Sequence, residues 1–134
     1  MSKKLKCVLL IDDDEATNFI HKMVVNKVDC AEKVVIALSG IKALEYLKHV
    51  PDEEHPKPDL ILVDINMPAM NGWEFLDEFT QLDESQKGHC VVMMLTTSLN
   101  PDDEDKSKTY EVIKGYIHKP LTPEKLEKIL ENYF

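Results

Sequence analysis

The sequence predicts an α/β protein in which helices cover both faces of a parallel sheet. Short apolar runs of strand length alternate five times with segments of helical periodicity. The runs are almost continuously apolar, which is typical of parallel strands buried on both faces. A chain of 134 residues with 43% hydrophobic residues is large enough to bury one core, and no internal repeat or second domain is evident.

The five expected strands are apolar runs bounded by polar or turn-forming residues. They cover residues 6–12, 33–38, 59–64, 90–97 and 115–118. Before the third strand, the charged and proline-rich segment 51–58 has nothing to bury and predicts an exposed loop.

Each strand is followed by a helical pattern. Four of the five helices show apolar residues at i, i+3 and i+4 spacing, which predicts one buried side. The residues expected on these buried sides are Ala16, Phe19, Ile20, Met23 and Val24; Ala43, Leu44, Leu47 and Val50; Phe75, Leu76, Phe79 and Leu82; and Leu126, Ile129, Leu130 and Tyr133. The fourth helix is indicated by Asn100 at the N-cap, Pro101 at the first position and acids in the first turn, and Thr122 and Pro123 begin the last helix similarly.

The composition argues against several classes of protein. Sixteen basic and 25 acidic residues give a net charge of −9, so we expect no binding to nucleic acid or to an anionic membrane surface. Cys7, Cys30 and Cys90 form no CxxC pair and follow no secretory signal, so we expect reduced cysteines in a cytoplasmic protein. The five histidines show no HxH or HExxH spacing, and we assign them no metal.

Polar side chains follow the strands at the carboxyl edge of the expected sheet, where open parallel sheets bind ligands. Residues 12–14 are aspartates, Asp64 ends the third strand, residues 96–98 are Thr-Thr-Ser, and Lys119 follows the fifth strand. Carboxylates gathered at one edge repel one another and need a cation. Mg²⁺ suits them because it takes carboxylate, carbonyl and water ligands and leaves positions for phosphate oxygens. The sequence therefore predicts a Mg²⁺ and phosphoryl site beside a carboxylate able to accept the phosphoryl group.

Four segments of the chain resemble the landmark segments of bacterial response-regulator receiver domains. They are VLLIDDDEATN, LILVDINMPAMNGWEFL, VVMMLTTS and GYIHKPLTPEKL, which occur in the family's order and cover almost the whole chain. The resemblance implies a flavodoxin-like doubly wound (βα)5 fold with a five-stranded parallel sheet in the order 2-1-3-4-5. It also implies a regulatory domain that at most catalyses its own phosphorylation and dephosphorylation, and is not otherwise an enzyme.

The resemblance assigns roles to the acidic residues. Asp64 is implied to be the phosphoacceptor and one of the Mg²⁺ ligands. Asp13 would bind Mg²⁺ directly, Asp12 largely through water, and Asn66 through its backbone carbonyl.

The resemblance also assigns roles at the ends of the last two strands. Thr96 would hold a phosphoryl oxygen, and Lys119 would pair with the phosphoryl group or with the free carboxylate. Tyr116 matches the aromatic residue that changes rotamer in this family when the threonine moves, so Thr96 and Tyr116 form the implied switch. The Lys119-Pro120 peptide is implied to be cis.

Simpler structural explanations exist for each of these residues taken alone. Asp12, Asp13 and Asp14 could be helix caps, Asp64 could cap a turn, and Lys119 could be a solvated surface charge. These explanations are independent of one another and do not explain why the strand ends carry complementary groups. Two positions depart from the family pattern. Asp14 is a third acid, which we interpret as the start of the first helix, and Thr97 stands where a small residue is usual.

Two other classes of function fit parts of the sequence. A Mg²⁺-dependent phosphatase with an aspartyl nucleophile usually carries DxD, with the second acid as general acid. Asn66 occupies that second position here, and this class is kept as the alternative. A flavodoxin-like cofactor binder needs a hydroxyl- or glycine-rich phosphate loop after the first strand, where this chain has DDDEATN.

We expect a stand-alone receiver domain over residues 1–134, because only the closing helix follows Lys119. The phosphoryl donor would be a phosphohistidine on a sensor histidine kinase or a histidine phosphotransfer protein, docking beside the site along the first helix. Output would come from binding a target protein. The chain is expected to be a monomer, with dimerisation on phosphorylation left open.

Overall fold

Five parallel strands form one sheet in the computed structural model, which describes residues 4–49, 52, 54–87, 90–97 and 100–134. The strands are β1 (Leu5–Ile11), β2 (Ala31–Ala37), β3 (Leu60–Asp64), β4 (Val91–Thr96) and β5 (Ile113–His118). Their order is β2-β1-β3-β4-β5, and every neighbouring pair is parallel. The expected fold class and strand order are therefore confirmed.

The described residues form one more helix than the sequence predicted. The helices are α1 (Glu15–Val28), α2 (Gly40–Lys48), α3 (Gly72–Thr80), α4 (Glu84–Lys87), α5 (Pro101–Ser107) and α6 (Pro123–Tyr133). The additional element, α4, is a single turn with no buried residue, so it has no apolar periodicity by which it could be recognised. The expected caps are confirmed, since the side chains of Asn100 and Thr122 accept hydrogen bonds from backbone N–H groups of α5 and α6.

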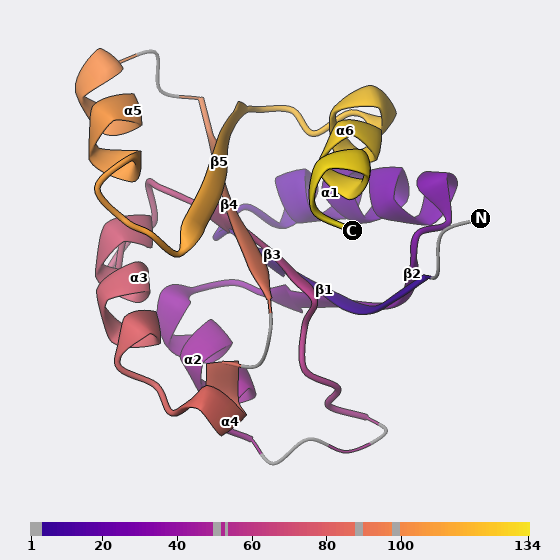
Figure 1. Ribbon diagram of the computed structural model, residues 1–134, viewed down its shortest axis with the longest axis horizontal. Helices are drawn as coiled ribbons and strands as arrows, with labels where there is room; N and C mark the ends of the chain where they lie inside the picture. Colours follow the sequence, from indigo (N-terminus) through magenta and orange to yellow (C-terminus); the bar gives the residue numbers. More distant parts are fainter. Residues whose placement is uncertain (1–3, 50–51, 53, 88–89, 98–99) are drawn as a thin grey trace.

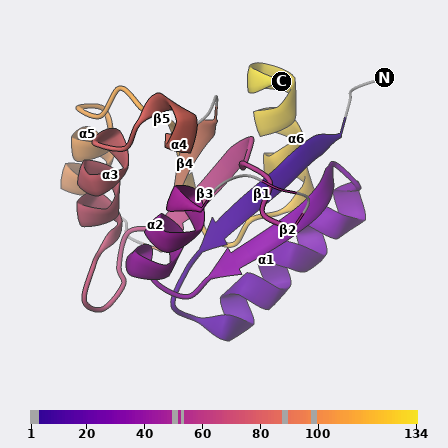
Figure 2. The same cartoon turned by 90° about the horizontal axis from the view of Figure 1, so that it is seen from below.

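Helices cover both faces of the sheet, with α1 and α6 on one face and α2, α3, α4 and α5 on the other (Figures 1 and 2). The core under the second group, which we call the aromatic core, contains Trp73, Phe75 and Phe79 together with residues of β1, β3 and β4. The core under α1 and α6, the aliphatic core, contains Leu10, Leu62 and similar residues. None of the described helices is both long enough and apolar enough to cross a membrane.

The predicted buried sides of α2 and α3 are largely confirmed. Ala43, Leu44 and Leu47 are buried on α2, as are Phe75, Leu76 and Phe79 on α3. Val50, expected to extend the first set, lies outside the described residues, and Leu82 lies beyond the end of α3, where it is partly buried. On α6, Leu126 and Ile129 are buried and Leu130 is partly buried, but Tyr133 is 39% exposed and donates its hydroxyl hydrogen to the Lys114 carbonyl.

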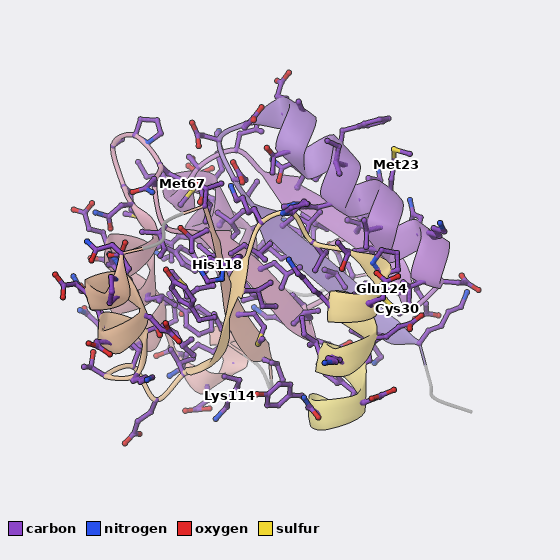
Figure 3. All side chains as sticks on the ribbon, turned by 90° about the horizontal axis from the view of Figure 1, so that it is seen from above. Met23, Cys30, Met67, Lys114, His118 and Glu124 are labelled. Atoms are coloured by element: carbon purple, nitrogen blue, oxygen red, sulfur yellow. The ribbon has the colours of Figure 1, made fainter. Side chains whose placement is uncertain are left out.

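The predicted buried side of α1 is largely wrong. Val24 is partly buried against the aliphatic core, but Ala16 is exposed. Phe19, Ile20 and Met23 are 64%, 50% and 56% exposed, and Met23 projects from the outer side of the helix (Figure 3). The buried residues of α1 are Asn18, His21 and Val25. Two polar side chains can occupy this inner side because each makes a hydrogen bond there, which offsets the cost of their burial.

Candidate functional site

The turn after β1 places one buried and one exposed aspartate beside each other. Asp12 is 4% exposed, and its Oδ1 accepts the Asp14 N–H at 2.9 Å. The Asn18 side chain donates to the Asp12 backbone carbonyl at 2.8 Å, so a hydrogen bond from α1 fixes this turn. Asp13 points to solvent. The turn therefore presents two carboxyl groups at the edge of the sheet.

Asp14 is the N-cap of α1, as the sequence predicted. Its carboxylate accepts hydrogen bonds from the Ala16 N–H at 3.1 Å and the Thr17 hydroxyl at 2.8 Å. These two bonds, the one from Thr17 first, lower the pKa of Asp14. The third acid of the run thus has a structural use in starting the helix.

The loop after β3 is folded tightly against the strand. Asp64, the last residue of β3, is 6% exposed, and the Gly72 N–H donates to the Ile65 carbonyl at 2.8 Å. A Cβ at Gly72 would lie 2.5 Å from the Asp64 carbonyl oxygen and 3.0 Å from the Ile65 Cα. Only glycine permits this approach, which brings the start of α3 directly behind Asp64. Asn71 and Glu74 close that end of α3 with a capping box.

Lys119 connects the ends of three strands. Its backbone N–H donates to the Thr96 carbonyl at 2.8 Å. Its Nζ lies 2.5 Å from Asp12 Oδ2 and 3.2 Å from Asp64 Oδ1. The Lys119-Pro120 peptide is cis, as expected. The structure therefore brings together Asp12, Asp64 and Lys119 from turns that are far apart in the sequence.

Two side chains that the sequence did not single out hold the segment around Lys119. Lys125 of α6 donates to the His118 carbonyl at 2.7 Å and to the Pro120 carbonyl at 3.1 Å. His21 of α1 accepts the Leu121 N–H on its Nε2 at 3.3 Å. His21 and Leu121 are 100 residues apart, so no local sequence signal could have predicted this contact.

The site is electrostatically unbalanced toward negative charge. Burial raises the pKa of Asp64, the positive charge of Lys119 opposes that rise, and the charge of Asp12 adds to it. Burial alone would lower the pKa of Lys119, but the hydrogen bond to Asp12 and the charges of Asp64 and Asp12 raise it overall. The Lys119 ammonium therefore pairs with two buried carboxylates, those of Asp12 and Asp64, and Asp13 is a third acid nearby.

The donor set fits a hard divalent cation. Asp12, Asp13 and Asp64 can each offer a carboxylate oxygen, and these oxygens lie within 4.8 Å of one another. Mg²⁺ is held by such oxygen donors and tolerates waters in its remaining positions. The residues present thus fit Mg²⁺, the ion that the resemblance to receiver domains implies.

The remaining predicted residues lie around this cluster at different depths. Thr96 is fully buried at the end of β4, Thr97 is exposed, and Ser98 lies outside the described residues. Asn66 is exposed, and the interaction of its backbone with the Asp64 carboxyl group opposes the rise in the pKa of Asp64. Tyr116 lies farther away on β5, opposite Met94, where its half-buried ring packs partly against the aromatic core.

The chain resembles known proteins over nearly its whole length. The family model described as the response regulator receiver domain matches residues 8–131. Response regulator Rcp1 of Synechocystis sp. is 30% identical over 128 residues, covering 94% of this chain and 84% of Rcp1. A two-component response regulator from Cytophaga hutchinsonii has a similar structure, with a TM-score of 0.86 and 33% identity over 97% of each chain. The phosphorylated cyanobacterial phytochrome response regulator RcpA has a TM-score of 0.73 and 29% identity over 95% of this chain and 89% of its own.

The protein belongs to the response regulator receiver domain family. It is a regulatory domain of two-component signalling, a class whose members act through phosphorylation by histidine kinases. The aspartyl phosphatase kept as an alternative finds no support in these comparisons.

Proposed function

We propose that Asp64 is the residue that accepts the phosphoryl group, and that Asp12, Asp13, Asp64 and the Asn66 carbonyl hold the Mg²⁺. The observation that carries this proposal is Lys119 Nζ lying within 3.2 Å of Asp64 and 2.5 Å of Asp12 at the carboxyl edge of the sheet. Asp64 and Asp12 share the ammonium of Lys119. A phosphoryl group that binds together with Mg²⁺ would therefore meet two positive charges beside the Asp64 carboxylate.

The proposed transfer forms one bond and breaks one. An oxygen of the Asp64 carboxylate attacks phosphorus, and the P–N bond of the donor's phosphohistidine breaks. The electron pair of that bond goes to the imidazole nitrogen, which takes up a proton from water, and Asp64 becomes an acyl phosphate. When bound, Mg²⁺ supplies positive charge to the phosphoryl oxygens.

The chain's own residues orient and neutralise the group. Lys119 pairs with a phosphoryl oxygen, and its ammonium is already held beside Asp64. Thr96 lies at the same edge of the sheet, where its hydroxyl donates to a second phosphoryl oxygen after transfer. Both residues stabilise charge without exchanging protons with the group.

We propose that the donor, a sensor histidine kinase or a histidine phosphotransfer protein, docks on the exposed side of α1. The exposed side chains of Phe19, Ile20 and Met23 form an apolar surface on α1, which begins immediately after the aspartates at residues 12–14. A donor bound to this surface would present its phosphohistidine to the cluster that contains Asp13 and Asp64. The exposure of these side chains, which contradicts the predicted burial, is what supports this docking surface.

We propose that output depends on Thr96 and Tyr116. After phosphorylation Thr96 moves toward the phosphoryl group, and the Tyr116 ring fills the vacated space. Tyr116 lines a hollow of about 220 Å³ beside α6 and another of about 270 Å³ beside α5, so a change of its rotamer alters the surface on both sides of β5. A target protein that binds the changed surface better shifts the equilibrium toward it and favours phosphorylation by the same free energy.

The first experiment tests the acceptor. Acetyl phosphate and Mg²⁺ should add one phosphoryl group to the wild-type chain, as detected by intact-protein mass spectrometry, and none to Asp64→Asn. Asp83→Asn, which changes an exposed acid outside the cluster, is the matched control and should be labelled as well as wild type. Undiminished labelling of Asp64→Asn would place the acceptor elsewhere. Asp13→Ala should weaken Mg²⁺ binding in a titration while leaving the acceptor in place.

A second experiment tests the switch. Aromatic NMR spectra with and without beryllofluoride should differ for the Tyr116 ring, and Thr96→Val should reduce that difference. Identical Tyr116 signals in both states would reject the switch and leave the acceptor assignment standing.

We further propose that the protein acts in the cytoplasm as a stand-alone receiver domain and a monomer. The extent of the match to Rcp1, 84% of that protein's length, supports a regulator with little beyond the receiver domain. The three cysteines are free thiols, and burial raises the pKa of Cys90 to about 11, so this thiol is protonated and weakly reactive at neutral pH.

A further inference from the structure

Two histidines and an aspartate between α2 and β3 form a second cluster, separate from that of Asp12, Asp13 and Asp64. His49 is the C-cap of α2, and Asp52 and His55 follow at intervals of three residues. Each can offer one ligand atom, and these atoms lie within 4.8 Å of one another. The spacing H-x2-D-x2-H is not one of the common histidine motifs, so only the structure indicates that these three residues form a cluster.

The geometry of the cluster resembles part of a coordination shell. His55 Nδ1 lies 3.0 Å from Asp52 Oδ1. This contact is a hydrogen bond. Donor atoms of neighbouring ligands in a tetrahedral zinc site lie roughly 3.4 Å apart, so a small outward movement of the two side chains would let an ion replace the shared proton. The His49 and His55 rings are stacked, with centroids 4.0 Å apart, so the two imidazoles lie next to each other.

The carboxylate is fixed before any ion binds. The N–H groups of Glu54 and His55 donate to Asp52 Oδ1 at 2.9 and 2.7 Å.

The rest of the segment is tied to the body of the protein. The Tyr46 hydroxyl donates to the Pro56 carbonyl at 2.7 Å, and Lys33 donates to the Glu54 carbonyl. Lys57 donates to the carbonyls of Leu47 and Gln86 at 2.6 and 2.7 Å. These bonds hold both ends of the segment, which lowers the entropy that binding would otherwise cost.

We propose that His49, Asp52 and His55 form a binding site for a divalent transition-metal ion such as Zn²⁺, with water in the remaining position. Two imidazoles and one carboxylate are a ligand set that zinc accepts, whereas Mg²⁺ prefers sites made of oxygen donors alone. The ion would join the end of α2 to the segment that leads into β3. It would therefore stabilise the folded state without taking part in phosphorylation.

The test is a Zn²⁺ titration of chelator-treated protein in competition with a chromophoric chelator. Saturating Mg²⁺ is present throughout to occupy the acidic site. We expect one Zn²⁺ per chain, at least tenfold weaker binding by His49→Ala and by His55→Ala, and no such loss by His118→Ala, which changes an exposed histidine on β5. Asp52→Asn, which keeps the shape but removes the charge, should also weaken binding.

A spectroscopic measurement separates this site from other ligands on the chain. Co²⁺ in place of Zn²⁺ should give visible absorption bands whose intensity is lost in the His49→Ala, His55→Ala double variant, and circular dichroism checks that this variant is folded. Zn²⁺ binding that persists in the double variant, or that fails to saturate at one ion per chain, overturns the proposal. These outcomes are independent of the phosphoacceptor, because labelling of Asp64 by acetyl phosphate can be measured in the same variants.

Discussion

Helices α1 and α3 show the same kind of amphipathic sequence pattern, but α3 buries its apolar side and α1 exposes most of it. On α3, the apolar residues Phe75 and Phe79 are 0% and 1% exposed and lie in the aromatic core. On α1, the apolar residues Phe19 and Met23 are 64% and 56% exposed. An apolar stripe thus identifies a helix, but it does not determine whether the stripe packs on the sheet or remains available to a partner.

The two helices differ in what fixes their rotation about their own axes. α3 is placed by large side chains that fill the space over β3 and β4. α1 is placed by polar contacts, because Asn18 bonds the Asp12 carbonyl and His21 bonds the Leu121 N–H. The inner side of α1 therefore serves the loops that carry Asp12 and Lys119, which leaves its apolar side outward.

The largest effect is expected from truncation on α3. Phe75→Ala should lower the free energy of unfolding by about 3–5 kcal/mol, because it removes a fully buried ring and leaves a cavity. Urea denaturation followed by circular dichroism measures this. A loss below about 1 kcal/mol would mean that α3 can repack, and that the two helices differ less than the burial suggests.

A smaller effect is expected at the polar inner side of α1. His21→Leu removes the acceptor of the buried Leu121 N–H and should cost about 1–3 kcal/mol of stability. His21→Gln, which keeps an acceptor, is the matched control and should recover part of the loss. If Leu and Gln are equivalent at this position, packing rather than the hydrogen bond holds α1 in its rotation.

The same contact predicts a pH dependence. His21 accepts a hydrogen bond on Nε2 and is buried, and burial, followed by the charge of Lys119, lowers its pKa from 6.5. The unfolded chain therefore takes up this proton at a higher pH than the folded chain does. The contribution of His21 to stability is complete above pH 6.5 and is lost as the pH falls through the lowered pKa of the folded state.

Denaturation of wild type and His21→Gln between pH 5 and 8 checks this expectation. Wild type should lose stability more steeply below pH 6.5 than the variant, which retains the other four histidines. Parallel curves would show that His21 does not titrate differently in the folded state.

The smallest effect on stability is expected from Phe19→Ala, which makes on α1 the same change as Phe75→Ala on α3. Because Phe19 is largely exposed, its removal should change the free energy of unfolding by no more than about 0.5 kcal/mol. The rate of phosphoryl transfer from a phosphohistidine donor should nevertheless fall, while labelling by acetyl phosphate should not. A large loss of stability would return Phe19 to the core, as the periodicity had predicted.

The sequence by itself determined the parallel sheet and the meeting of Asp12, Asp64 and Lys119, whereas the strand order was implied by the resemblance to receiver domains. Near-continuous apolar strands require cover on both faces, and the carboxyl ends of parallel strands necessarily lie at one edge. Caps such as Asn100 and Thr122 were also predictable, because a cap depends on residues within one turn of the chain.

Only the tertiary structure decided the features that join distant or irregular segments. The rotation of α1 about its axis depends on the hydrogen bond between His21 and the Leu121 N–H. The position of the segment around Lys119 depends on the hydrogen bonds from Lys125 to the His118 and Pro120 carbonyls. The approach of His49 to His55 depends on a segment tied down by bonds from three different elements. Such contacts are set by how whole elements pack and not by residue spacing, because a periodic pattern specifies what one helix or strand can bury but not which neighbour it meets.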